Sequence, residues 1–415
     1  MYLSSIDRPH AAKTSRRRAL FLVSGNVLTL GAVSLITDVS SEMVTAVLPV
    51  YLMIGLHLSP TVYGVVDGTY TGATALLRLV GGYVADRAHR RKLIAGLGYG
   101  LSAVAKLGLL AAGNAVGAIG AVIALDRTGK GLRTAPRDAL ITLSTPPRLY
   151  GRAFGVHRMM DTIGAFAGPL VALGILAGTA QAYDAVFVAS FCIAAFGVLV
   201  LVLFVRDHRD EQPPKGTVAP SALRGLLRMA PVRRMVLAAC LAGMVTIGDG
   251  FVYLLLQRRE QLSIGWFPLL AVGTNLSYLL LATPLGVLAD KIGRQKVVIG
   301  GYLALMLVYL LLFGPLGGWP LLVVVLGLYG LFYASTDGVL IALAGPVLPS
   351  GVRTTGIALI QTGQALSYLV SSVLFGLAWT TWGPAAAIRI AAAMVAVAVL
   401  AVALLLRGIP AEQPA

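Results

Sequence analysis

The sequence predicts an all-α integral membrane protein with twelve transmembrane helices in two six-helix, pseudo-symmetric bundles. Two observations carry this prediction. Hydrophobic residues make up 57% of the 415 residues and charged residues only 12%, with a mean hydropathy of +0.84, which is too apolar for a soluble chain of this length. A short charged sequence at Gly82–Lys92 also recurs about half a chain later, at Gly286–Lys296. A repeat of that length in so apolar a chain indicates two similar membrane bundles joined in tandem.

The individual spans follow from the apolar runs. A helix needs about 20 residues to cross about 30 Å of hydrocarbon, and the runs are continuous rather than alternating, which favours helices over a β-barrel. We predict spans at 22–53, 60–85, 92–113, 115–138, 150–177, 183–205, 233–257, 265–289, 296–315, 319–346, 352–380 and 385–406. The domain organisation predicted is a tail at 1–19, a bundle at 20–205, a Pro-containing linker at 206–230, a bundle at 231–407 and a tail at 408–415.

The net charge of +16 reports topology rather than nucleic-acid binding. Arginine and lysine gather before the first span, in the loops after even-numbered spans and in the linker, whereas the other side of the membrane has little beyond Arg258 and Arg259. This asymmetry follows the positive-inside rule and predicts a bacterial inner-membrane protein with both termini in the cytoplasm. The apolar run after the basic N-terminal arm is too long for a signal peptide, so we expect an uncleaved tail.

The repeated loop reads G-x-x-x-D-[RK]-x-G-[RK]-x-[RK] and resembles the loop signature of the major facilitator superfamily. The second copy fits at every position, and the first differs only at His89, where the family has glycine. The resemblance implies a cytoplasmic gate in which Asp86 meets the eleventh span near Arg353 and Asp290 meets the fifth near Arg152. The predicted gate residues are Gly82, Asp86, Arg87, Arg91, Arg137, Arg152, Gly286, Asp290, Lys291, Gly293, Arg294 and Arg353.

Two further motifs resemble elements of the same superfamily. Arg127-x-x-x-Gly131 is similar to its R-x-x-Q-G element, with Lys130 in place of glutamine. The fifth span is similar to its antiporter signature, except that Ala172 and Leu173 replace the final glycine pair. Glycine at this spacing lets a helix bend and pack closely, and the signature implies proton-driven export. The helix-bend residues are Gly155, Gly164, Gly168 and Pro169.

Charged side chains inside the predicted spans are the candidate site. A charge at bilayer depth costs about 2.5–3.5 kcal/mol on insertion scales, so such residues are expected to face a cavity and to function. Asp38 and Glu42 share one helix face, as do His157 and Asp161, because residues four apart are neighbours on a helix. We predict that these four take and release protons. Either substrate contacts or static charge pairs are expected for Asp67, Asp126, Arg127, Lys130 and Arg158.

The sequence therefore predicts a monomeric secondary transporter that works by alternating access and exports a small organic molecule, either drug-like or a metabolite. No nucleotide-binding, zinc or nucleophile motif is present, so we expect no enzyme and no cofactor, with a proton gradient as the energy source. The expected partners are the lipid bilayer and a small-molecule substrate, without nucleic acid. Alternatives are uptake of an anionic metabolite, favoured by Arg127 and Lys130, transport of a divalent metal ion through nitrogen and oxygen ligands, and a non-transporting sensor on the same scaffold.

Overall fold

The structure is a computed structural model that describes residues 24–88, 90–113, 115–146, 149–207, 225–337, 339, 343, 347–348 and 353–407. At residues 76, 78–88, 151 and 353–355 it describes the backbone alone. Regular structure in this part of the chain is helical throughout. The long apolar runs of the sequence form the helices, and the predicted all-α fold is confirmed.

The first half of the chain begins with a helix capped by Ser24, whose hydroxyl accepts the N–H of Val27. Pro49 lies near the end of this helix, and the next turn widens into a π-helix, as expected where proline removes a backbone donor. Bounds of the first-half elements are α2 (Gly25–Val50), η1 (Tyr51–Gly55), α3 (Pro60–Ala88), α4 (Arg91–Ala112), α5 (Val116–Leu143), α6 (Tyr150–Gly178) and α7 (Tyr183–Phe204). Each lies within a few residues of a predicted span.

The second half differs from the prediction at its first span. The expected continuous helix at 233–257 is two helices, because the chain leaves helical geometry between Met244 and Asp249. The hydroxyl of Tyr309 accepts the N–H of Ile247 at 3.0 Å and lies 3.2 Å from the carbonyl of Val245. The Tyr309 hydroxyl therefore provides hydrogen bonds to backbone groups of the break, which unwound backbone needs inside a membrane. The elements of this half are α9 (Ala230–Met244), α10 (Asp249–Arg259), η3 (Ile264–Trp266), α11 (Phe267–Ile292), α12 (Arg294–Leu311), α13 (Gly318–Thr336), α15 (Arg353–Trp382) and α16 (Pro384–Leu406).

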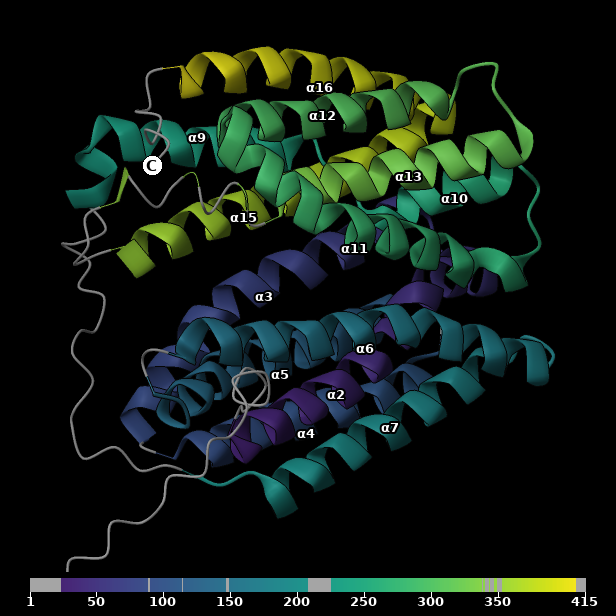
Figure 1. Ribbon diagram of the computed structural model, residues 1–415. Coiled ribbons are helices and arrows are strands. Elements are labelled where there is room, and N and C mark those ends of the chain that lie inside the picture. Colours follow the sequence, from purple (N-terminus) through teal and green to yellow (C-terminus); the bar gives the residue numbers. More distant parts are fainter. Residues whose placement is uncertain are drawn as a thin grey trace, which may run out of the picture.

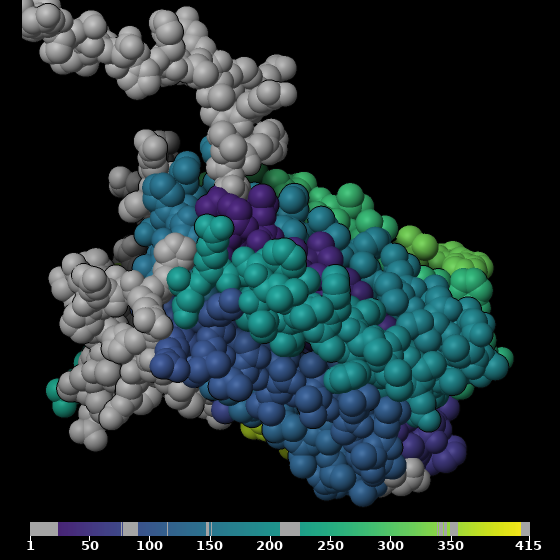
Figure 2. All heavy atoms as spheres, turned by 90° about the horizontal axis from the view of Figure 1, so that it is seen from below, coloured from purple at the N-terminus to yellow at the C-terminus, as the bar shows by residue number. Residues whose placement is uncertain are grey.

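In the described part of the chain, ten helical segments are long and apolar enough to cross a membrane. The two predicted spans outside this group are α3 and α5, which carry more polar residues. Apolar side chains face outward on many of the other helices, for example Leu97 on α4 (58% exposed) and Phe204 on α7 (65% exposed). Figure 2, which views the molecule from below relative to Figure 1, shows the surface that residues of the first half form. Exposed apolar helices of this length are suited to lipid contact.

The helices separate into two groups in space (Figure 1), with α2–α7 on one side and α9–α16 on the other. We call these groups the first half and the second half. Across the boundary, α3 packs against α15 and α6 against α11. We call the end of the molecule where α7 stops and α9 starts the linker end, and the opposite end, which carries Pro60 and Trp382, the far end.

Candidate functional site

Contacts between the halves gather at the far end. The hydroxyls of Thr61 on α3 and Thr380 on α15 lie 2.8 Å apart, and Thr61 also donates to the carbonyl of Gly376 at 3.3 Å. One face of α3 carries glycine, so the two backbones approach closely. A Cβ atom at Gly68 would lie 2.8 Å from the carbonyl oxygen of Leu369, a distance that only glycine permits. The far end is therefore closed here.

A cavity of about 550 Å³ lies between the halves on the linker-end side of these contacts. Tyr70 on its wall follows Gly68 by half a turn of α3. Cavities of this size hold small organic ligands. The wall from the first half consists of Tyr70, Thr71, Thr74, Ala75, Arg127 and Lys130, and that from the second half of Gly243, Thr246, Asp249, Phe332, Tyr333, Thr336, Asp337, Gln361, Gln364, Ala365 and Tyr368.

Arg127 of α5 is buried in a charge network of the first half. Its guanidinium donates to Asp126, with Nε 3.0 Å from Oδ2, and its Cζ lies 3.4 Å from the centroid of the Tyr70 ring. On the other side of Asp126 stands Lys106 of α4, whose Nζ is 3.5 Å from Oδ1, and Ser102 donates to the same oxygen. Arg127 is thus paired within its own half, and Lys106 is a member of the network that the sequence analysis missed.

Lys130 differs from Arg127 although it lies on the same cavity wall, one turn further along α5. Among the residues that the structure describes, its ammonium group has no hydrogen bond or ion pair. Since an ammonium group without a partner is costly at membrane depth, Lys130 is the cation of this wall that is available to a ligand.

The second wall carries an acid held by tyrosines. Asp249 is the first residue of α10, and its Oδ1 accepts hydrogen bonds from the hydroxyls of Tyr329, at 2.7 Å, and Tyr333. Near the rim, Tyr278 donates to Asp337 at 3.0 Å. The intramembrane site residues predicted from the sequence all lie in the first half, whereas tyrosine and glutamine also make the second wall polar. The signal was present as tyrosine and glutamine inside apolar runs.

The predicted proton carriers lie in the first half. Asp38 on α2 is 3.7 Å from the guanidinium of Arg133 on α5. His157 and Asp161, both on α6, are 3.7 Å apart, and His157 Nε2 is 3.0 Å from the hydroxyl of Ser34. Glu42 has no ion pair within the described residues and packs beside Gly168.

These four residues do not assemble into a metal centre. Across the described ranges, no group of three or more His, Cys, Asp or Glu side chains lies close enough together to hold a metal ion. Asp38 instead faces Arg133, and His157 and Asp161 face each other. Arg158, next to His157, is exposed and makes no ion pair with other described residues.

The helix-bend residues have different surroundings along α6. A Cβ atom at Gly164 would lie 2.5 Å from the carbonyl oxygen of Leu35, and one at Gly168 would lie 2.7 Å from that of Val39, both on α2. At Gly155 there is open space instead. Pro169 lies inside α6 without ending it. Close packing of α6 on α2 therefore depends on Gly164 and Gly168.

Four residues of the predicted gate, Gly82, Asp86, Arg87 and Arg353, lie where the structure describes the backbone alone. In the second copy of the loop, Asp290 is 68% exposed and lies 3.3 Å from Arg294. Gly293 has φ +102°, which explains why the signature has glycine there. The remaining members lie at helix ends or within helices at the linker end: Gly286 and Lys291 on α11, Arg91 at the start of α4, Arg137 beside Asp138 on α5, and Arg152 on α6.

The fold and the cavity between two halves agree with the comparisons to known proteins. The pattern of the Major Facilitator Superfamily matches residues 30–273 and 259–415, and the chain belongs to this superfamily. It is 30% identical over 367 residues to an uncharacterized MFS-type transporter of Methanocaldococcus jannaschii, covering 86% of this chain and 89% of that protein. It is also 35% identical over 157 residues to an uncharacterized protein of Mycobacterium tuberculosis, covering 38% of each chain.

Solved structures share the fold at low identity. The nucleoside transporter NupG superposes with a TM-score of 0.75 at 15% identity, over 92% of this chain and 100% of that one. A bacterial homologue of the human lysosomal transporter Spinster, in an inward-facing and occupied conformation, gives 0.71 at 15% identity, over 94% and 98%. The protein is thus a multi-pass membrane protein and a secondary transporter of this superfamily rather than an enzyme.

Proposed function

We propose that the chain exports a small organic molecule in exchange for protons, with the cargo bound in the cavity between the halves. The observation that carries the proposal is this polar cavity of about 550 Å³, which lies beside closed far-end contacts. A chamber sealed at one end, between two halves that can rock, is what alternating access requires. The protein would act as a single chain and belong to a bacterial branch that exports drugs or metabolites.

The packing of α6 supports export. The resemblance to the antiporter signature rests on glycines, and Gly164 and Gly168 are the two that hold α6 against α2. Proton exchange needs acids within the membrane, for which we propose Asp38, Glu42, His157 and Asp161. The basic residues at the linker end support a bacterial plasma-membrane location with that end, and both termini, in the cytoplasm.

A second candidate is transport of an anionic molecule. The observation in its favour is Lys130, a cation on the cavity wall that has no acid within ion-pair distance among the described residues, although Asp38 and Glu42 interact with it from farther away. An ammonium group binds a carboxylate or phosphate through charge-assisted hydrogen bonds. On this reading the acidic group of the cargo pairs with Lys130 as Asp126 pairs with Arg127.

The experiment uses the purified chain in liposomes loaded with a pH-sensitive dye. Neutral, cationic and anionic compounds of matched size are added under an imposed proton gradient. We expect a compound-dependent proton movement opposite in direction to the compound. Compound flux that ignores the proton gradient would refute the exchange, and flux restricted to anions and lost in Lys130→Gln would favour the second candidate.

A further inference from the structure

Asp67 stands at the boundary between the closed far end and the cavity. It lies seven residues into α3 from Pro60, so its depth from the far end is roughly 10 Å at 1.5 Å per residue. Thr61, which bonds Thr380, is nearer the far end, and Tyr70, which lines the cavity, is nearer the linker end. Asp67 therefore lies on α3 between a residue that closes the far end and a residue that lines the cavity.

Two of the hydrogen-bond donors to Asp67 come from the other half, while Tyr63 of its own helix also interacts with the carboxyl group. Oδ2 accepts the hydroxyl of Tyr368 at 2.9 Å and that of Ser372 at 2.7 Å, both on α15. The carboxyl group also lies against the break between α9 and α10, because a Cβ atom at Gly248 would be 2.7 Å from Asp67 Cγ. First-half residue Asp67 is therefore enclosed by two elements of the second half.

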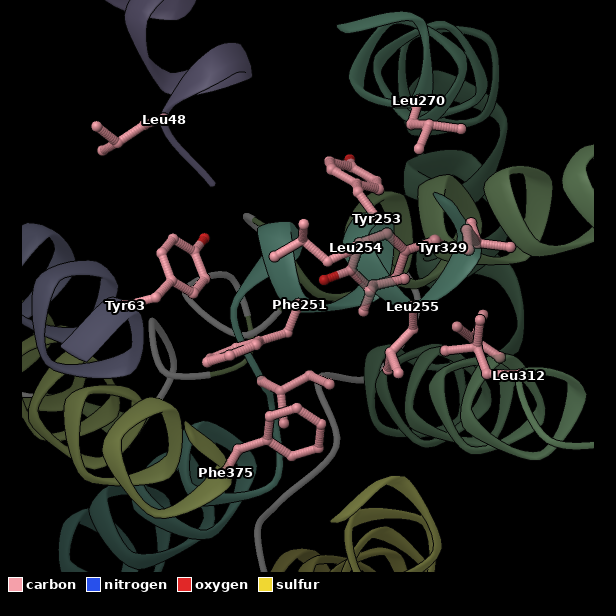
Figure 3. Packing of buried hydrophobic residues seen from close by; sticks show 14 of the residues in the cluster. Leu48, Tyr63, Phe251, Tyr253, Leu254, Leu255, Leu270, Leu312, Tyr329 and Phe375 are labelled. Carbon is pink, nitrogen blue, oxygen red and sulfur yellow. The ribbon is translucent and has the colours of Figure 1, made fainter. Parts of the chain in front are cut away.

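The surroundings of Asp67 contain acids and phenols but no cation within ion-pair distance among the described residues. The other titratable groups that face it are Tyr63 on α3, Tyr368 on α15 and Asp249 on α10. Beyond them, the ring of Phe251 packs between those of Tyr63 and Phe375, with centroids 4.7 and 4.9 Å away, as Figure 3 shows. The carboxyl group is thus shielded from the far side by aromatic rings.

Three other acids of the first half have partners that move with them. Asp38 faces Arg133, Asp126 faces Arg127, and Asp161 faces His157, all within α2–α7. Rocking of one half against the other leaves those pairs intact. Opening of the far end must instead separate α3 from α15, so it removes the Tyr368 and Ser372 donors from Asp67 and admits water to it.

We propose that Asp67 carries the coupling proton and that its bonds to Tyr368 and Ser372 hold the far end closed. This rests on the proposed proton exchange and assigns the coupling proton to Asp67 in place of Asp38, Glu42, His157 and Asp161. With the far end open, the carboxylate takes a proton from the far-side solution. With the far end closed, the carboxyl proton moves to the Tyr368 oxygen while the Tyr368 hydroxyl proton moves to cavity water. A carboxylate, a neutral phenol and a hydronium ion result.

The strength of the closed contact then depends on protonation. A carboxylate accepts hydrogen bonds that are about twice as strong as those of a neutral acceptor. Deprotonated Asp67 therefore favours the closed far end, and its protonation favours separation of α3 from α15. Because Tyr368 also lines the cavity, a bound cargo would contact one of the two donors directly.

The first test reads the far end without any cargo. Spin labels are placed at His57 and Thr381, exposed far-end residues of opposite halves, after Cys192 and Cys240 are replaced by serine. In lipid nanodiscs, the distance between the labels should lengthen as the pH falls in the parent chain. In Asp67→Asn it should be long at every pH, whereas Asp184→Asn, an exposed far-end acid, should respond as the parent does. A pH response retained in Asp67→Asn would overturn the proposal.

Ser372→Ala keeps the assignment testable if Asp67→Asn does not fold. It removes one donor to the carboxylate, so the opening transition should move upward by about one pH unit. An unmoved transition would count against the closed contact.

The second test uses the dye-loaded liposomes and an exchanged compound. In Asp67→Asn, the ratio of proton movement to compound exchange should fall at least tenfold. If that ratio is kept in Asp67→Asn and lost only when Asp38, Glu42, His157 or Asp161 is replaced, the proton belongs to that residue and the proposal is wrong. Absence of any compound flux would refute the proposed export. If the far end still opened with falling pH in the parent chain and this response were lost in Asp67→Asn, the result would support the assignment of Asp67.

Discussion

The guanidinium of Arg133 on α5 lies 3.7 Å from the carboxylate of Asp38 on α2. Arg133 is buried, and its Cζ also stands 4.5 Å from the centroid of the Tyr99 ring on α4. One cation therefore joins three helices of the first half. The acid that the sequence nominates as a proton carrier has a structural partner.

The first prediction concerns the stability that this pair provides. Asp38→Asn leaves the charge of Arg133 without its acid, so we expect a loss of about 2 kcal/mol in the free energy of unfolding. Removing one partner of a fully buried pair costs about 3–5 kcal/mol, and Asp38 keeps 20% exposure of its side chain. Thermal unfolding in detergent measures the loss. The double variant Asp38→Asn/Arg133→Met should recover part of it, and a double variant less stable than the single one would contradict a static pair.

The second prediction compares two glycines of α6. Gly164→Ala drives a methyl group into the backbone of α2, and overpacking of this kind costs about 1–3 kcal/mol. Gly155→Ala meets open space and should leave stability unchanged or raise it by about 0.5–1 kcal/mol, because alanine favours the helix. Unfolding of the two variants side by side provides the measurement. Equal losses would mean that the motif acts through flexibility instead of packing.

The third prediction concerns the break between α9 and α10. Tyr309→Phe removes the hydroxyl that serves the N–H of Ile247 and the carbonyl of Val245, and each buried polar group left unpaired costs about 1–3 kcal/mol. We expect a lower unfolding temperature and faster hydrogen exchange at residues 245–248. Tyr51→Phe is the control, since the Tyr51 hydroxyl has no hydrogen bond within the described residues. Unchanged exchange at the break would show that it is held by other contacts.

The fourth prediction separates Lys130 from Arg127. Lys130→Gln should weaken the binding of an anionic compound about tenfold, which is about 1.4 kcal/mol, and leave neutral compounds unaffected. The physical reason is that Arg127 is already neutralised by Asp126. Titration calorimetry with a matched neutral and anionic pair measures the difference. Arg234→Gln, which removes an exposed charge at the start of α9, should have no effect, and an equal effect of both variants would assign the result to net charge.

The sequence was sufficient for the helices and for the half-chain repeat. Continuous apolar runs of 20 or more residues favour helices in lipid, since a helix bonds its backbone groups within its own segment. The seventh span was the exception. Its run contains Gly248 and Asp249, and the unwound backbone at Val245–Gly248 is bonded by the hydroxyl of Tyr309 on α12.

The candidate site was predictable only in part. Intramembrane charges such as Asp38, Arg127 and Lys130 are visible in a sequence because they interrupt apolar runs. Partners are not visible, since they lie on other helices: Lys106 reaches Asp126 from α4, and Tyr329 reaches Asp249 from α13.

By itself, then, the sequence determined that this chain is a helical transporter of two related halves, because burial in lipid restricts both composition and backbone. Tertiary structure decided which charges have partners. Lys130 and Arg127 are alike in sequence, and only the packing of α3, α4 and α5 gives Arg127 an acid and leaves Lys130 to the cavity. The same holds for Asp67, whose donors Tyr368 and Ser372 lie some three hundred residues away along the chain. The distance between α3 and α15 is set by glycine residues on their facing sides, such as Gly68. A local sequence pattern does not show which helix lies opposite such a face.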